Sequence, residues 1–174
     1  GPAIHAVSHF PILPAASQMV MVTARLHDPD GVASAQLKYR VDPAPTHVSA
    51  AMRDDGAGGD AVAGDGVFTA SLPGQATGAM VAFYLEATDA RRASSTFPDD
   101  APNRECLVRF GDPTPSTGFG IYRQWFAQKT INTWNNRPTL SNERLDGTFV
   151  YGDFRVIYNF SSRYAGSPYH QGFG

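Results

Sequence analysis

The chain has 174 residues, a formal net charge of −2, and 17 Gly and 13 Pro against only 17% charged residues. This length fits one domain, or one domain with an appendage, and it can bury a core without metals or disulfides. The near-neutral charge and the scattered Lys and Arg argue against a nucleic-acid partner. Cys106 is the single cysteine, which excludes an intrachain disulfide, and no stretch approaches the roughly 20 apolar residues of a membrane span.

Residues 1–111 show the alternation of apolar and polar residues that is typical of strands with one wet face. Turn sequences such as Asp28-Pro29-Asp30-Gly31 separate the runs. The predicted strands are residues 4–7, 20–27, 35–40, 48–52, 68–72, 81–88 and 106–110. About seven short antiparallel strands at this spacing predict a mainly-β fold, an immunoglobulin-like or fibronectin-type-III-like Greek-key β-sandwich.

The pattern changes after residue 111. Residues 112–118 are rich in Pro, Ser, Thr and Gly and are predicted to be a linker. Apolar spacing then predicts a helix over residues 119–136, with Ser116 or Thr117 as its cap and Arg137-Pro138 at its end.

Residues 148–151 and 154–160 are predicted to form a β-hairpin around Gly152-Asp153. A hairpin with apolar residues on both faces needs a partner surface. We therefore expect residues 119–174, a helix-plus-hairpin extension, to belong to something longer or to be completed by another chain.

A Gly-rich loop carries Asp55, Asp60 and Asp65 at intervals of five residues. Carboxylates on a flexible loop suit Ca²⁺, so these three are candidate calcium ligands, although the spacing is not that of an EF-hand. Turn chemistry accounts for the same residues, because Asp forms Asx-turns and Gly adopts positive φ. The turn interpretation is the favoured one, and Asp28 and Asp30 form a second, weaker acidic turn.

The same loop carries a family resemblance. Residues 53–69, RDDGAGGDAVAGDGVFT, resemble the signature of bacterial extracellular Ig-like modules, which are fibronectin-type-III-like domains of surface and secreted proteins. The flanking VTARLHDPDGVASAQLKYR and VAFYLEATDA are similar to strands of those modules, so that the resemblance covers about residues 18–110. It implies an extracellular or cell-surface location in a bacterium.

A second resemblance covers residues 117–174. GIYRQWF, LSNERLDGTFVYGDFRVIYN and RYAGSPY are similar to the opening of a CotH-type spore-coat kinase domain, which an Ig-like module commonly precedes. Arg163, Gly166 and Ser167 match an early stretch of that family. The resemblance implies a kinase-like parent whose metal and catalytic carboxylates lie beyond this segment, so this chain is expected not to be an enzyme.

Other candidate sites favour structural roles. Residues 151–155 contain Asp153-Phe154 but lack the Gly that a kinase metal motif needs, so Asp153 is predicted to be a turn residue. The five His are expected to be ordinary surface residues, although His5 and His9 could share a strand face. Cys106 is predicted to be a small core residue.

Dense aromatic residues in the extension point to protein contact. The candidate interface residues are Trp125, Phe126, Trp134, Phe154, Tyr158 and Tyr164. A protein partner or a second copy is expected there, with carbohydrate as the open alternative.

We therefore predict a non-catalytic extracellular structural or interaction module, with self-assembly into multimers or filaments through residues 119–174. The alternatives are a fragment of a CotH-like, ATP- and metal-dependent kinase, and a calcium-dependent adhesin or carbohydrate-binding module.

Overall fold

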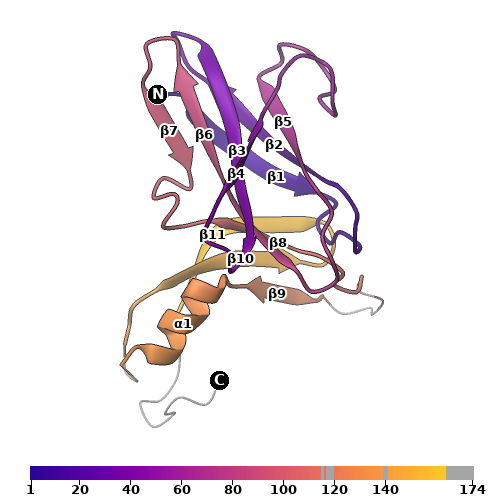
Figure 1. Ribbon diagram of the computed structural model, residues 1–174, viewed down its shortest axis with the longest axis vertical. Helices are drawn as coiled ribbons and strands as arrows, with labels where there is room; N and C mark the ends of the chain where they lie inside the picture. The colour runs from indigo at the N-terminus through magenta and orange to yellow at the C-terminus, as the bar shows by residue number, and fades with distance from the viewer. Residues whose placement is uncertain (115, 117–119, 139–140, 164–174) are drawn as a thin grey trace.

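A computed structural model describes residues 1–114, 116, 120–138 and 141–163. Its described elements are three antiparallel sheets and one short helix (Figure 1). The first sheet has the order β1 (Ala3–Phe10), β2 (Val20–His27), β5 (Val67–Leu72). The second has the order β4 (Val48–Ala51), β3 (Val32–Asp42), β6 (Met80–Asp89), β7 (Ser94–Phe97), and β8 (Cys106–Arg109) pairs with the other end of β6.

These two sheets pack face to face, and the chain crosses between them from β2 to β3, from β4 to β5 and from β5 to β6. The predicted β-sandwich is therefore confirmed. Its core is made of the apolar residues of the alternating runs, among them Val22, Leu37, Phe83 and Val108, all fully buried. β7 was not predicted, because its sequence Ser-Ser-Thr-Phe lacks the apolar alternation from which strands are read.

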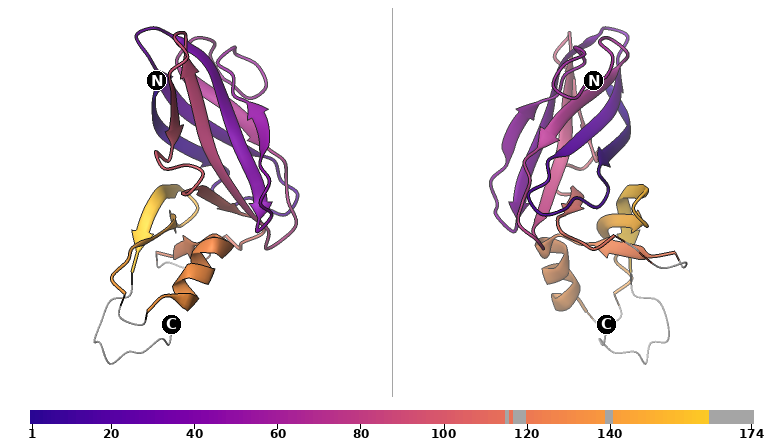
Figure 2. Two further views of the ribbon diagram at one scale, coloured as in Figure 1. Left: turned by 60° about the vertical axis from the view of Figure 1, so that its left-hand side comes forward. Right: turned by 90° about the vertical axis from the view of Figure 1, so that its right-hand side faces the viewer.

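The third sheet has the order β11 (Arg155–Ser162), β10 (Leu145–Tyr151), β9 (Tyr122–Trp125), and with α1 (Gln128–Asn136) it forms the extension. It lies at one end of the sandwich, as the views in Figures 1 and 2 agree. The expected helix-plus-hairpin extension is confirmed.

The predicted helix over 119–136 is wrong in its first half, where residues 122–125 form a strand that pairs with β10. Tyr122 and Phe126 have helical spacing, but Tyr122 instead stacks across the strand pair on Tyr151, so cross-strand contact overrides the local pattern. The expected caps Ser116 and Thr117 consequently do not begin α1. Its N-cap position is Ala127, which has no side-chain cap.

Sheet β11-β10-β9 turns one face toward the sandwich. Trp125 and Val150 on this face join Ile12, Ala82 and Leu107 of the sandwich in a second buried cluster. β6 and β8 are thus buried on both faces where the extension covers them, since Val81 and Val108 face the main core while Ala82 and Leu107 face the extension. The partner surface that the hairpin needs is provided by its own chain.

The described residues contain no helix long and apolar enough to cross a membrane.

Candidate functional site

A group of charged residues joins the sandwich to α1. We call it the charged junction, and it consists of Arg40, Asp42, His47, Glu105 and Lys129. Glu105 is only 3% exposed. Its carboxylate accepts hydrogen bonds from Nε and Nη2 of Arg40 at 2.8 and 2.7 Å. His47 Nε2 lies 2.8 Å from the same carboxylate, and Lys129 Nζ of α1 lies 2.8 Å from it.

Glu105 is held ionised by this arrangement. Burial alone would raise the pKa of Glu105, but hydrogen bonds from Arg40, Lys129 and His47 outweigh it and lower the pKa to about 2. The same contacts raise the pKa of Arg40, with the hydrogen bond to Glu105 as the largest cause.

The charged junction has little bonding capacity left for a ligand. The four contacts from Arg40, His47 and Lys129 match the roughly four acceptor sites of a carboxylate. Lys129 uses all three of its donors, since Nζ also reaches the carbonyl oxygens of Pro102 and Asn103 at 3.0 and 2.8 Å. This saturation supports a structural role for Glu105 over a catalytic one.

The start of α1 is tied to the sandwich as well. The Gln128 backbone N–H donates to Asp42 Oδ2 at 2.7 Å, so a carboxylate 86 residues away takes the place of a local cap. Two clefts of about 420 and 380 Å³ lie beside this contact, and both are lined by Asp42, Pro43 and Gln128. The smaller one opens onto the charged junction.

A second tie runs through Tyr158 of β11. Its hydroxyl bonds to His9 Nδ1 of β1, and its ring meets Phe83 of β6 edge-on at 5.5 Å. Tyr158 thus contacts one strand of each sheet of the sandwich and belongs to the main core. Burial lowers the pKa of His9 to about 4 and raises the pKa of Tyr158 well above its usual value.

The position of His9 corrects the expectation that the histidines are ordinary surface residues. A register shift between His5 and Ser8, with Ala6 at φ 51°, sends His5 outward and His9 inward. The even spacing of the two residues therefore does not place them on one face. Cys106 is buried as predicted, and burial raises the pKa of its thiol.

The acidic loop, residues 54–66, joins β4 to β5. The structure gathers carboxylate oxygens of Asp54, Asp60 and Asp65 within 4.8 Å of one another. Two of the three sequence candidates, Asp60 and Asp65, are in this group. Asp55 is not, and its place is taken by Asp54; Asp55 instead accepts the Ala57 N–H and pairs with Arg53 at 3.4 Å.

Backbone donors occupy these carboxylates. Asp54 accepts N–H groups of Gly64, Asp65 and Gly66 at 2.7 to 3.2 Å. Asp60 accepts the Gly56 N–H at 2.6 Å. These contacts are the ones that turn chemistry requires.

Glycine also lets the backbone of the acidic loop approach the sandwich closely. Gly59 has φ +103°, and a Cβ there would stand 2.2 Å from the Met21 methyl carbon. A second acidic group brings Asp28 and Asp30 of the β2–β3 turn together with Asp89 at the end of β6. Asp30 pairs with Arg91 at 3.0 Å, and Asp89 lies 3.6 Å from the N-terminal amine.

The predicted interface residues fall into different environments. Trp125 and Tyr158 are buried inside the chain, whereas Phe154 is exposed at the hairpin turn. Phe126 and Trp134 are half-buried and pack on each other, with Arg137 over the Trp134 ring at 4.4 Å. Tyr164 lies outside the described residues. Asp153 is an exposed turn residue, as the sequence indicates.

The outward face of sheet β11-β10-β9 carries a ladder of rings, which the sequence did not single out as one surface. We call it the aromatic face; its members are Tyr122, Phe149, Tyr151, Phe154, Ile157 and Phe160. The Tyr122 and Tyr151 rings stack at 4.7 Å and 9°, and Phe154 and Phe149 flank the pair. Register could have revealed it, since Tyr122 opposes Tyr151 and Phe149 opposes Ile157.

No family model matches the sequence, and no curated protein matches it.

Proposed function

We propose that the chain is a non-catalytic structural module of a bacterial surface or secreted protein, in which the sandwich and the extension act as one rigid unit. The observation that carries the proposal is the position of Tyr158. A residue of the extension belongs to the main core of the sandwich, where it bonds to His9 of one sheet and packs on Phe83 of the other. A module joined in this way holds its two parts in one orientation, as a spacer or a connector requires.

The polar contacts at the junction support the same role. Lys129 and Asp42 tie α1 to the sandwich through a buried carboxylate network that is already saturated. Buried polar networks that are fully satisfied favour one arrangement over others. The extracellular location rests on the resemblance of the Asp- and Gly-rich loop, and the link to a CotH-like parent rests on residues 117–174.

The rigid unit is tested by small-angle scattering and limited proteolysis of the full chain. We expect one compact particle and no early cleavage between Phe110 and Tyr122. Two independently moving bodies, or rapid cleavage that releases a folded sandwich, would contradict the proposal. An ATP titration followed by calorimetry is expected to show no heat of binding, and measurable binding in the presence of Mg²⁺ would revive the kinase alternative.

A calcium-dependent role is the second candidate, because Asp54, Asp60 and Asp65 converge. The backbone N–H groups that they accept favour the turn interpretation, since Ca²⁺ takes six to eight oxygen ligands that must be free to face it. An unchanged melting temperature on adding Ca²⁺ or a chelator supports the turn, whereas a rise with Ca²⁺ that is lost in Asp60→Asn supports the ion.

A further inference from the structure

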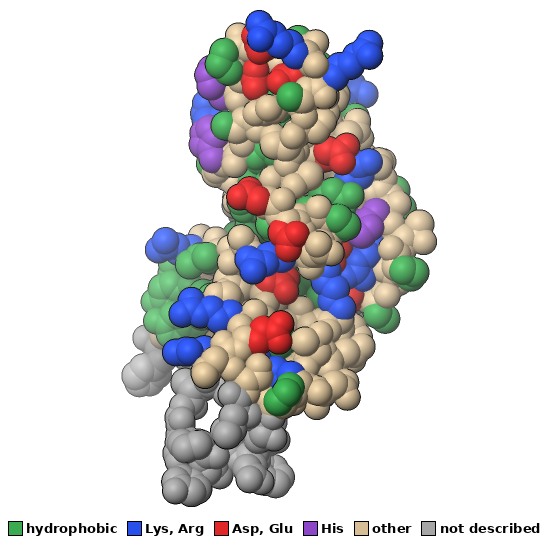
Figure 3. All heavy atoms as spheres, turned by 90° about the vertical axis from the view of Figure 1, so that its left-hand side faces the viewer, with side chains coloured by type: hydrophobic (Ala, Val, Ile, Leu, Met, Phe, Trp, Pro, Cys, Tyr) green, Lys and Arg blue, Asp and Glu red, His purple; other side chains and the backbone are tan. Residues whose placement is uncertain are grey.

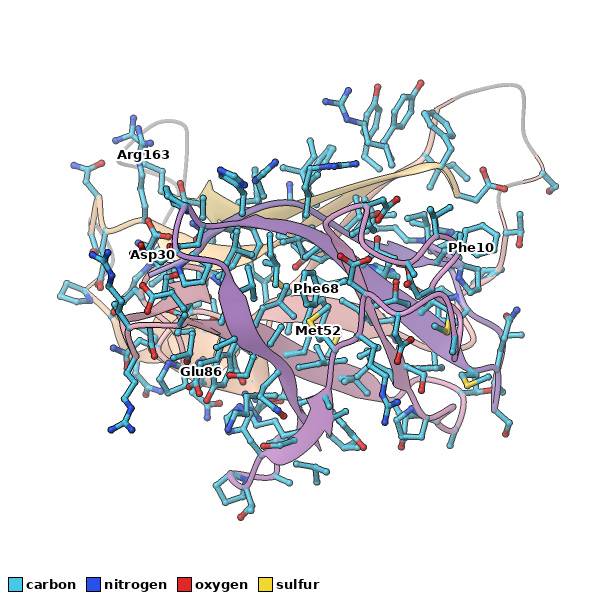
Figure 4. All side chains as sticks on the ribbon, turned by 90° about the horizontal axis from the view of Figure 1, so that it is seen from above. Phe10, Asp30, Met52, Phe68, Glu86 and Arg163 are labelled. Carbon is cyan, nitrogen blue, oxygen red and sulfur yellow. The ribbon has the colours of Figure 1, made fainter. Side chains whose placement is uncertain are left out.

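The aromatic face is an apolar surface at the base of the molecule. Tyr122, Phe154 and Ile157 are 62%, 65% and 42% exposed, although large apolar residues are normally buried. Figure 3 shows a hydrophobic patch on the lower half of the molecule with Lys and Arg side chains beside it. Arg155, opposite Tyr151 in the ladder, is one exposed cation of this face.

The arrangement of the rings bears on what they bind. Tyr122 and Tyr151 each turn one ring face to the other, and Phe154 meets Tyr151 from its side with the ring planes at 65°. A sugar ring stacks on an open aromatic face, and here one face of Tyr122 and one face of Tyr151 are covered by each other. An uneven apolar surface of this kind suits protein side chains, which pack against rings in many orientations.

The net charges of the extension and the sandwich indicate which surface of a second copy the aromatic face would bind. Described residues 112–114, 116, 120–138 and 141–163 carry six Lys and Arg against four Asp and Glu, a net charge of +2. Residues 1–111 carry eight against twelve, a net charge of −4. Two aromatic faces brought together would set like charges against each other, whereas the sandwich of another copy has the opposite sign.

We propose that the aromatic face binds the acidic end of the sandwich of a second copy of this chain. This end, which carries the β2–β3 turn and the acidic loop, lies away from the extension (Figure 1), and its residues 25–31, 53–67 and 89–92 hold seven Asp against four Arg. The inference rests on the proposed structural role and names the partner of that module. Because the two surfaces differ, the contact is heterologous, and repetition gives an open chain of subunits instead of a closed dimer.

The test is sedimentation velocity and light scattering of the full chain over a range of concentrations. We expect the average mass to rise above that of the 18.7 kDa monomer with concentration and to fall back when salt is raised from about 0.05 to about 0.5 M, which screens surface charge. Phe154→Ser should abolish the rise. Val48→Ser, which alters another exposed apolar residue, on β4, is the matched control and should leave the rise intact.

The acidic end is tested by the double variant Asp28→Asn/Asp65→Asn. Asn keeps the side-chain oxygens that accept the Asp30 and Val67 N–H groups, so the turns are retained while two charges are lost. We expect association several-fold weaker at low salt. At a concentration where each variant alone is monomeric, an equimolar mixture of this double variant with Phe154→Ser should form a one-to-one dimer, because each protein retains one intact surface.

Several outcomes would overturn the inference. A monomer at every concentration, equal association of Phe154→Ser and Val48→Ser, or growth that stops at a dimer of the unmodified chain each contradicts it. Retention on an insoluble polysaccharide that Phe154→Ser loses, without self-association, would assign the face to carbohydrate. None of these results touches the rigid-unit proposal, which fails only if scattering or proteolysis separates sandwich from extension.

Discussion

His9 and Tyr158 are 149 residues apart in sequence and share a hydrogen bond inside one core. His9 Nε2 lies 3.1 Å from the Ile12 carbonyl oxygen, so this nitrogen carries the proton and donates it. Nδ1 is then the acceptor of the Tyr158 hydroxyl. The pair links the first strand of the chain, β1, to its last described strand, β11.

Removing the Tyr158 hydroxyl should destabilise the whole chain. Tyr158→Phe leaves His9 Nδ1 buried without a donor, which is expected to reduce the free energy of unfolding by about 1–3 kcal/mol. Tyr158→Ala also removes the ring from the core and should cost about 3–5 kcal/mol. Urea denaturation followed by fluorescence measures both. Tyr122→Phe, at an exposed ring of the same sheet, is the control and should stay within about 0.5 kcal/mol of the unmodified chain.

His9 predicts a loss of stability under mildly acidic conditions. Its pKa falls from 6.5 to about 4 on folding, so between these values the unfolded chain binds a proton that the folded chain does not. The contribution is complete above pH 6.5 and is lost as the pH falls toward about 4, amounting to about 3 kcal/mol in all. Unfolding free energies measured at a series of pH values test it. His9→Gln should flatten the slope in this window, and an unchanged slope would contradict the assignment to His9.

Glu105 predicts a second loss at lower pH. Its pKa is lowered from 4.5 to about 2, so its stabilising contribution is present above about pH 4.5 and disappears as the pH falls through about 2. In the His9→Gln variant this lower step should remain. Glu105→Gln should remove it, and persistence of the step in Glu105→Gln would show that another carboxylate is responsible.

Removing the Glu105 carboxylate from the charged junction should lower the free energy of unfolding more than removing the Lys129 cation. Glu105→Gln removes the buried counter-charge that Arg40 and Lys129 share and leaves Arg40 with Asp42 alone, so we expect it to cost about 3–5 kcal/mol. Lys129→Met removes one half-exposed cation, while Glu105 keeps its hydrogen bonds to Arg40 and His47. The free energy of unfolding should therefore fall by only about 1 kcal/mol. Thermal and urea unfolding measure the difference. Arg144→Met, at an exposed cation of the extension, should be nearly neutral, and equal losses for the first two variants would refute a network centred on Glu105.

In the acidic loop, Asp54 should contribute more to the stability of the folded chain than its neighbour Asp55. Asp54→Asn, in the absence of calcium, puts an amide group in place of the oxygen that accepts the Gly66 N–H, and it removes the negative charge from the bonds to Gly64 and Asp65; it should cost about 1–2 kcal/mol. Asp55→Asn retains the acceptor for Ala57 and loses only an exposed ion pair, so its effect should be about 0.5 kcal/mol or less. Unfolding in chelator measures both, and the reverse order would return Asp55 to the centre of the loop.

Residue type and spacing were sufficient to predict the sandwich. Alternation in runs such as β2 and β6 reports which residues face the core, because successive side chains of a strand point to opposite sides. The Asp- and Gly-rich loop was likewise recognisable as a turn with candidate metal ligands. Choosing Asp54 over Asp55 was beyond the sequence, because neighbouring residues have the same chemistry and only the path of the loop decides which one points inward.

Tertiary structure alone decided how the extension is built and attached. Residues 122–125 have the spacing of a helix but pair with β10, since a neighbouring strand offers hydrogen bonds and ring contacts that local propensity does not include. The same holds for Glu105 and Lys129, and for His9 and Tyr158. The sequence by itself determined which segments form strands and which residues make a core; the partnerships between distant residues required the folded chain, because they depend on where separate elements meet in space.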